Sequence, residues 1–188
     1  MPVLYLFCAS LLLLSAYIVF RKMVRRNYLE RGRLTPLSSF LQLLVFVGLM
    51  CFPYLYNPPG WDWFWKVELS TDPWYRVIGL VLIIAGFVVA FGTMGWFGLR
   101  RAFGIQASGL VQSGPYHFSR NPQILGGYLL VLGVALQWPS LYSLGWIFLY
   151  AIIGHMMIVT EEEYLTREYG PAYDQYVEDI PRYLRFPR

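Results

Sequence analysis

The stretch QILGGYLLVLGVALQWPSLYSLGWIFLYAIIGHMMIVT, residues 123–160, decides the fold of this chain. It is apolar throughout except at residues 137–140 (QWPS), a turn sequence because proline cannot continue a helix. We therefore expect two helices joined by a tight turn. The first, 123–137, holds about 15 residues and measures roughly 22 Å, less than the ~30 Å of a bilayer core. Part of its crossing then falls to the segment before it. Irregular backbone at that depth is tolerated only where protein covers it or water fills a cavity, so residues 114–121 are a natural place for a pocket.

Apolar residues make up 57% of the 188 residues, against roughly 45–50% in a soluble domain. Residues 3–20 form an apolar run with its basic residues behind it, which indicates a retained span rather than a cleavable signal peptide. The second span is expected to begin at Thr35, a helix-capping residue followed by Pro36, and to end near residue 56.

The third span repeats this device at Asp72 and Pro73 and continues to about residue 99, long enough to cross the membrane with tilt. The sequence thus predicts an all-α polytopic membrane protein with five transmembrane helices, the last two forming a short hairpin, and a C-terminal helix. We expect residues 1–188 to form a single membrane domain. Residues 1–56 would hold the first two spans, 73–99 the third, and 100–188 a cofactor-binding region with the hairpin and tail.

Basic residues predict the orientation. If the chain crosses the membrane five times, three basic clusters lie on the same side: the one after span one, the one after span three and the one in the tail. Their residues are Arg21, Lys22, Arg25, Arg26, Arg31, Arg33, Arg100, Arg101, Arg120, Arg167, Arg182, Arg185 and Arg188. The other side keeps Lys66 and Arg76, among acidic residues and tryptophans. Cytoplasmic loops are rich in Lys and Arg, so we expect the N-terminus outside and the C-terminus in the cytoplasm. Because these charges lie in short clusters beside apolar runs, the net charge of +4 does not indicate nucleic-acid binding.

Two polar segments stand out in this apolar chain. Residues 109–122 read GLVQSGPYHFSRNP, and residues 161–170 read EEEYLTREYG. Polar residues within a membrane protein are costly and mark functional sites. On the expected topology, both segments face the cytoplasm.

At these residues the chain resembles the isoprenylcysteine carboxyl methyltransferase and phospholipid methyltransferase superfamily of integral membrane enzymes. The resemblance covers roughly residues 95 to 184, and its elements are LVQSGPY at 110–116, Arg120, Asn121, Pro122, Gly126, Glu161, Glu162, Leu165, Tyr169, Gly170, Tyr173, Tyr176 and IPR at 180–182. It implies a methyltransferase that uses S-adenosylmethionine at the cytoplasmic membrane face. The Asn-Pro pair is similar to bacterial members, which implies a bacterial cytoplasmic membrane.

The resemblance implies a cofactor site made of Ser108, Gly109, Leu110, Val111, Gly114, Tyr116, Arg120, Asn121, Pro122, Gln123, Ile124 and Glu161. Glycine allows close approach of the backbone, and residues outside helices offer unbonded polar groups to an adenine edge. The helix that opens at Pro122 presents its first amides and positive dipole end to an anion such as the cofactor carboxylate.

Three residues are candidates for catalysis: Arg120, Glu162 and His155. Consecutive helical residues lie ~100° apart, so the three glutamates at 161–163 cannot all face one pocket, and Glu163 is expected to be a solvated helix exit. Glu162 shares a helix face with His155, and Glu161 shares one with Met157.

The sequence does not identify the group that accepts the methyl. Met157 stands where the isoprenylcysteine enzymes are assigned an arginine for the substrate carboxylate, so Met157 and His155 become the candidate substrate contacts. We expect in-line methyl transfer to a lipid-like or amphipathic acceptor delivered from the membrane, which requires alignment and water exclusion. A carboxylate or thiolate needs no base, whereas an amine or thiol needs one, with His155 or Glu162 as candidates.

Two alternatives stay open. A sterol-reductase-like enzyme would bind a nicotinamide dinucleotide, and a non-catalytic membrane scaffold would explain the spans without the polar segments. No metal site is expected, because no metal-ligand motif is present.

Overall fold

The computed structural model describes residues 2–56, 73–98 and 109–184, and these ranges contain helices and no strand. Their elements are α1 (Pro2–Ala16), η1 (Tyr17–Val24), α2 (Arg25–Arg31), α3 (Pro36–Cys51), η2 (Phe52–Leu55), α4 (Trp74–Phe97), η3 (Gly114–His117), α6 (Pro122–Gln137), α7 (Leu141–Tyr169) and α8 (Pro171–Asp179). The predicted all-α membrane class is confirmed. Ser108 and Asp72 lie outside the described residues.

The first helix runs further than the apolar run from which the first span was predicted. Its apolar run was expected to end at Phe20, but α1, the π-helical η1 and α2 form one helical stretch from Pro2 to Arg31. Arg25 pairs with Glu163 of α7, so the basic residues pack within the helix rather than ending it. Gly32 ends the stretch with a φ of 63°, a left-handed conformation that glycine adopts freely.

The starts of α3 and α7 follow from local sequence. Thr35 caps α3 by accepting a hydrogen bond of 3.3 Å from the Ser38 amide, with Pro36 at the first helical position, as predicted. Ser140 and Ser143 form a reciprocal capping box at α7. The predicted turn between the hairpin helices is therefore present, and α6 is short, with 16 residues.

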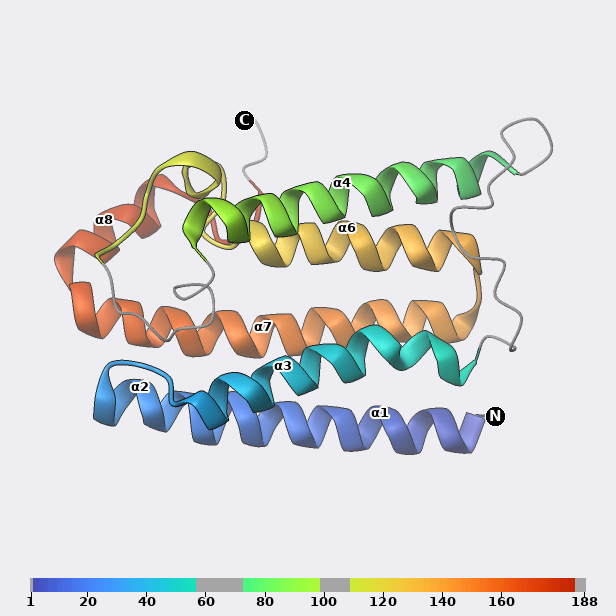
Figure 1. Cartoon of the computed structure of the whole chain (residues 1–188), viewed down its shortest axis with the longest axis horizontal. Helices are drawn as coiled ribbons and strands as arrows, with labels where there is room; N and C mark the ends of the chain where they lie inside the picture. Colours follow the sequence, from blue (N-terminus) through green and yellow to red (C-terminus); the bar gives the residue numbers. More distant parts are fainter. Residues whose placement is uncertain (1, 57–72, 99–108, 185–188) are drawn as a thin grey trace.

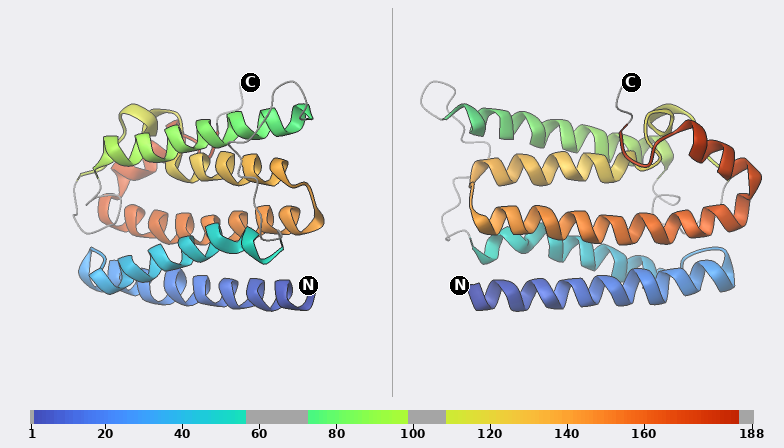
Figure 2. Two further views of the ribbon diagram at one scale, coloured as in Figure 1. Left: turned by 45° about the vertical axis from the view of Figure 1, so that its right-hand side comes forward. Right: turned by 180° about the vertical axis from the view of Figure 1, so that it is seen from behind.

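Five helices lie side by side and alternate in direction: α1, α3, α4, α6 and α7 (Figures 1 and 2). Four helical stretches are long and apolar enough to cross a membrane, namely Pro2–Arg31, Pro36–Leu55, Trp74–Trp96 and Leu141–Tyr169. The shorter α6 is apolar and runs antiparallel to α4 and α7. A fifth crossing by α6 remains a prediction. The segment before α6, α2 and α8 all lie at one end of the bundle.

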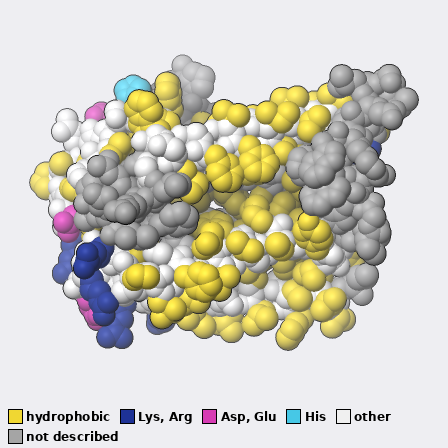
Figure 3. All heavy atoms as spheres, viewed as in Figure 1, with side chains coloured by type: hydrophobic (Ala, Val, Ile, Leu, Met, Phe, Trp, Pro, Cys, Tyr) yellow, Lys and Arg dark blue, Asp and Glu magenta, His cyan; other side chains and the backbone are white. Residues whose placement is uncertain are grey.

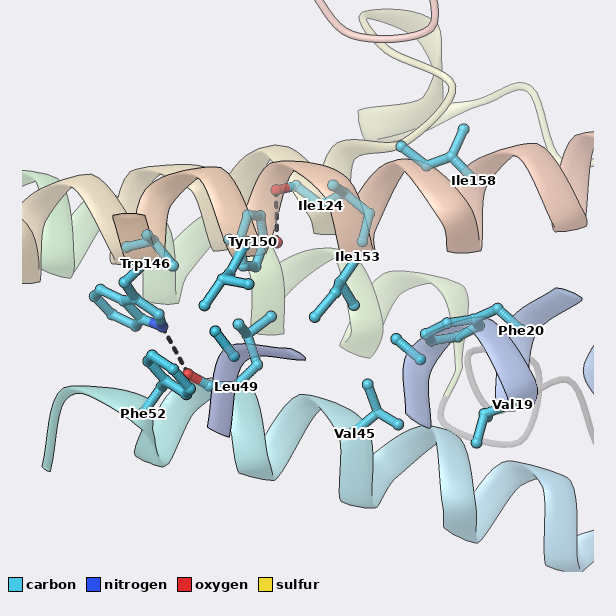
Figure 4. Packing of buried hydrophobic residues seen from close by; sticks show 14 of the residues in the cluster. Val19, Phe20, Val45, Leu49, Phe52, Ile124, Trp146, Tyr150, Ile153 and Ile158 are labelled. Carbon is cyan, nitrogen blue, oxygen red and sulfur yellow. Dashed lines mark hydrogen bonds between the residues drawn. The ribbon is translucent and has the colours of Figure 1, made fainter. Parts of the chain in front are cut away.

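The surface and the core both suit a bilayer. Hydrophobic side chains cover much of the face drawn in Figure 3, whereas Lys and Arg gather at the end formed by α2. Inside, α7 is joined to its neighbours by two buried polar contacts drawn in Figure 4. Trp146 Nε1 donates to the Leu49 carbonyl at 2.7 Å, and the Tyr150 hydroxyl donates to the Ile124 carbonyl at 3.0 Å. These bonds tie α7 to α3 on one side and to α6 on the other.

Helices α4 and α6 pack with their backbones in close approach at paired glycines. A Cβ atom added to Gly86 would lie 2.7 Å from the Gly126 carbonyl oxygen, and one added to Gly133 would lie 2.5 Å from that of Gly79. Small residues allow transmembrane helices to approach this closely and gain van der Waals contact. The glycines therefore set the position of α6, including its amino end.

We expect Gly86→Ala to lower the free energy of unfolding by about 1–3 kcal/mol, because overpacking a tight contact costs that much. Gly92→Ala is the matched control on the same helix, since an added Cβ there meets nothing within 4 Å. Thermal and denaturant unfolding in detergent would measure both variants. Equal stability of the two would contradict the packing role given to Gly86.

Candidate functional site

A small cavity lies where the segment before α6, the end of α7 and α8 meet. This polar cavity has a volume of about 70 Å³ and is lined by Gly109, Leu110, Val111, Tyr116, Arg120, Asn121, Glu161, Glu162, Leu165, Tyr169, Tyr173 and Tyr176. Small-molecule sites usually measure about 300–1,000 Å³. A nucleotide-sized ligand must therefore push these walls apart or extend out of the polar cavity.

Local structure places Arg120 and Asn121 at this cavity. Gly114 has a φ of 62°, and a Cβ there would lie 2.6 Å from the Trp96 indole nitrogen, so the η3 turn packs directly on α4. The buried Ser119 hydroxyl then accepts a hydrogen bond of 3.0 Å from the Asn121 amide. The chain enters α6 with Arg120 turned toward α7.

Glu162 sits at the centre of an ion-pair cluster. Its Oε1 lies 2.9 Å from Arg120 Nη1, and its Oε2 accepts from Arg182 Nη2 at 2.6 Å. The Arg120 and Glu162 side chains are only 9% and 12% exposed, so this pair is shielded from water. Arg120 also donates to the Tyr173 hydroxyl at 3.4 Å. One carboxylate thus joins the segment before α6, α7 and the tail.

Several polar atoms at the cavity keep unused bonding capacity. Arg120 Nε is buried and has no hydrogen-bond partner within the described ranges, whereas the buried Glu162 Oε1 has its ion pair with Arg120 Nη1. The Glu161 carboxylate, which lines the same cavity, has neither a hydrogen bond nor an ion pair among the described residues. Buried polar groups are normally satisfied, so each such atom calls for an explanation. A bound ligand that offers both an anion and a cation or hydroxyl groups would satisfy Arg120 Nε and Glu161.

Tyrosines form much of the remaining wall. The Tyr176 hydroxyl donates to the Tyr116 carbonyl at 2.7 Å, which fixes α8 against the η3 turn. Burial raises the pKa of Tyr173 and of Tyr176 to about 12, and burial together with the Glu161 charge raises the pKa of Tyr116 further. These phenols therefore keep their protons at neutral pH and act as hydrogen-bond donors.

A second, larger cavity opens beside the first. This apolar groove has a volume of about 820 Å³ and is lined by Val89, Leu125, Tyr128, Leu129, Leu132, Ala151, Ile152, His155, Met156, Tyr183 and Leu184. Polar groups are few here. His155 Nδ1 lies 3.0 Å from the Tyr183 hydroxyl, and the Tyr183 ring meets the edge of Tyr128 at 6.2 Å between centroids. No Lys, Arg, Asp or Glu is among its described lining residues.

A family model described as phospholipid methyltransferase matches residues 74–172, which include α4, α6 and α7. The chain belongs to this family. It is therefore an integral membrane methyltransferase. No curated protein and no solved structure matches it significantly. The matched region contains most residues of both cavities, whereas Tyr173, Tyr176 and Tyr183 follow it.

The structure brings together most of the residues that the resemblance implied for the cofactor. Gly109, Leu110, Val111, Tyr116, Arg120, Asn121 and Glu161 all line the polar cavity, together with Glu162. Four others lie nearby without lining it: Gly114, Pro122, Gln123 and Ile124. The buried Gln123 Nε2 has no partner within the described part of the chain, and Ile124 belongs to the core.

The candidates for catalysis and substrate contact are more widely distributed. His155 lines the apolar groove, whereas Met157 packs against the core and lines neither cavity. Glu163 was expected to be a solvated helix exit, which is wrong, because it pairs with Arg21 and Arg25 of the first helix. These arginines project from η1 and α2, so Glu163 joins the first helical stretch to α7.

Some residues at the two cavities were not assigned a role from sequence: Tyr128, Leu165, Tyr169, Tyr173, Tyr176, Arg182 and Tyr183. Most of these belong to the sequence signature that carries the family resemblance, and that signature could have identified them as site residues. Tyr128 and Tyr183 are not part of the signature. In the described ranges, no group of three or more His, Cys, Asp or Glu side chains could hold a metal ion.

We expect Glu162→Gln to lower the free energy of unfolding by about 3 kcal/mol, because it leaves the buried Arg120 charge uncompensated. Glu163→Gln is the matched control. It breaks a pair whose side chains are 34% and 42% exposed, so its cost should stay under about 1 kcal/mol. Denaturant unfolding of both variants measures the difference, and a larger loss for Glu163→Gln would disprove the central role of Glu162.

Proposed function

We propose that this protein transfers the methyl group of S-adenosylmethionine to an amphipathic or lipid-like acceptor that arrives through the bilayer. One observation carries the proposal: the protein has a polar cavity with charged groups and an apolar groove, and consecutive residues connect them, since Arg182 pairs with Glu162 of the polar cavity and Tyr183 lines the groove. A polar cosubstrate and a membrane-borne acceptor need such paired compartments.

The residues of the polar cavity suit S-adenosylmethionine. Arg120 Nε and the first amides of α6 would bind its carboxylate, since both offer donors and positive charge. Glu161 would accept from its ammonium or ribose hydroxyls, and the backbone of residues 109–111 would meet the adenine edge beside Tyr116. When bound, the cofactor supplies an electrophilic methyl group on a cationic sulfonium. Residues 100–188 would thus be the cofactor-binding region.

The apolar groove is suited to the hydrocarbon part of the acceptor. Leu132 and Ile152 line it and are exposed, so it opens toward the surrounding lipid. Its described lining offers no cation to a carboxylate, which favours an amine or thiol acceptor, because a buried anion needs a counter-charge. His155 would take the proton that such an acceptor loses. The direct transfer then depends on alignment and on exclusion of water.

In the proposed orientation, the polar cavity faces the cytoplasm. Lys and Arg side chains gather at the end formed by α2, where the segment before α6 also lies. Arg76 lies at the opposite end, close to Gln137 at the close of α6. By the positive-inside rule the Arg-rich end is cytoplasmic and the N-terminus lies outside.

We expect S-adenosylhomocysteine to stabilise the purified protein, by about 2.7 kcal/mol at a hundredfold excess over its Kd. Glu161→Ala should abolish this stabilisation, because it removes the carboxylate that would accept hydrogen bonds from the cofactor. Glu168→Ala, on the exposed face of the same helix, is the control and should respond as the wild type. Thermal unfolding in detergent provides the measurement.

The same experiment separates the alternatives. Stabilisation by NADPH in place of S-adenosylhomocysteine would favour a reductase, and stabilisation by neither would favour a scaffold. The acceptor class follows from radiolabelled methyl transfer into lipid extract, prenylcysteine analogues, amines and thiols. Labelling confined to a highly charged soluble metabolite would contradict delivery through the bilayer.

Filling the groove should block the acceptor alone. We expect Ile152→Trp to reduce methyl transfer into lipid at least tenfold while leaving S-adenosylhomocysteine affinity unchanged, because the indole occupies space in the apolar groove. Phe148→Trp is the matched control, one turn earlier on α7, exposed and outside the groove. Transfer assays and calorimetric titration would test this, and undiminished transfer by Ile152→Trp would exclude the groove as the acceptor site.

A further inference from the structure

Two neighbouring side chains near the end of the described chain make contacts at different cavities. Residues 180–184, here termed the strap, follow α8 and cross between the polar cavity and the apolar groove. Arg182 reaches Glu162, which lines the polar cavity, through contacts of 2.6 and 3.0 Å. Tyr183 lines the apolar groove and bonds to His155. The strap thus forms part of the apolar groove and contacts a lining residue of the polar cavity.

The backbone of the strap is fastened to the residues that open α6. The Arg120 amide donates to the Pro181 carbonyl at 3.0 Å. The Arg182 carbonyl accepts from Asn121 Nδ2 at 3.1 Å and from Ser119 Oγ at 3.3 Å. Arg120 and Asn121 both line the polar cavity, so a ligand there that displaces them also displaces the strap.

The other side of the strap orients the histidine. The Tyr183 hydroxyl forms a hydrogen bond with Nδ1 of His155, so Nε2 is the ring nitrogen that remains for a group in the groove. Tyr128 of α6 supports the Tyr183 ring by an edge contact. A hydrogen bond that fixes one ring nitrogen sets the orientation of the whole imidazole. Tyr183 itself need not touch the acceptor to influence it.

We infer that Tyr183 is a positioning residue, and that the strap links the state of the polar cavity to the orientation of His155 in the apolar groove. The path runs from Arg120, Asn121 and Glu162 through the strap backbone and the Arg182 side chain to Tyr183. This inference rests on the proposed function, because it assigns the polar cavity to the cofactor and the groove to the acceptor. It adds that the cofactor, once bound, orients His155 for the acceptor.

The chain contains 2 histidines, which gives this inference a direct readout. In protein labelled with ¹⁵N-histidine, S-adenosylhomocysteine should shift the ring resonances of His155 although the polar cavity does not include that residue. Arg182→Gln should also shift them, since it releases the strap from Glu162 without touching His155. Arg167→Gln, on the exposed face of α7, is the matched control and should leave them in place.

Tyr183→Phe keeps the ring and removes only the hydroxyl. We expect its affinity for S-adenosylhomocysteine to stay within about twofold of wild type, its His155 resonances to lose their response, and its methyl transfer into lipid to fall about 10–100-fold through misplacement. Tyr17→Phe, an exposed tyrosine of η1, is the control for removing a phenol hydroxyl. Calorimetry, nuclear magnetic resonance and transfer assays measure the three quantities.

The outcomes separate this inference from the function on which it rests. If wild-type protein fails to bind S-adenosylhomocysteine, the proposed function fails and the inference fails with it. If the ligand binds but leaves the His155 resonances unmoved, or if Tyr183→Phe transfers methyl groups as wild type does, only the role of the strap is overturned. A shift of the His155 resonances in Arg182→Gln but not in Arg167→Gln supports it.

Discussion

A single buried carboxylate, that of Glu162, holds together three parts of the chain that are distant in sequence. It pairs with Arg120 ahead of α6 and with Arg182 in the strap, while its own backbone belongs to α7. A low-dielectric interior tolerates such charges only as a group, because each ion alone would be costly to bury. The cluster therefore specifies a geometry as well as a contact. It brings the walls of the polar cavity together and leaves Glu161 beside it without a counter-charge.

A second constraint on the structure comes from apolar packing, in which no charged groups take part. Paired glycines let α4 and α6 approach until backbone meets backbone, and this fixes where α6 begins. Helix α7 is bonded to α6 through Tyr150, yet an apolar groove of about 820 Å³ remains between α4, α6 and α7. Tight packing on one side of α6 and space on the other are what a membrane enzyme needs when its acceptor arrives from the lipid. The family match to phospholipid methyltransferases agrees with that arrangement.

Patterns within the sequence predicted much of this architecture because they depend on local physics. Apolar runs long enough to cross a bilayer, the cap at Thr35 and the turn before α7 required no tertiary information. The end of the first helix was not predicted, because it depends on contacts between distant segments. The arginines after Phe20 look like a boundary to a reader of sequence, but Arg25 finds Glu163 on α7, and that contact joins residues 138 positions apart.

By itself, the sequence determined the helical membrane class, the short hairpin and the polar residues available for a site, because hydropathy, capping and residue chemistry are local properties. Only the tertiary structure decided how those residues are distributed between the polar cavity, the apolar groove and the core. It put Glu161 and Glu162 at the polar cavity, His155 in the apolar groove and Met157 against the core. It also brought Arg182 of the strap to Glu162 and the Tyr183 hydroxyl to His155. Helical periodicity specifies which residues share a face, but the neighbour that each face meets depends on packing between distant segments.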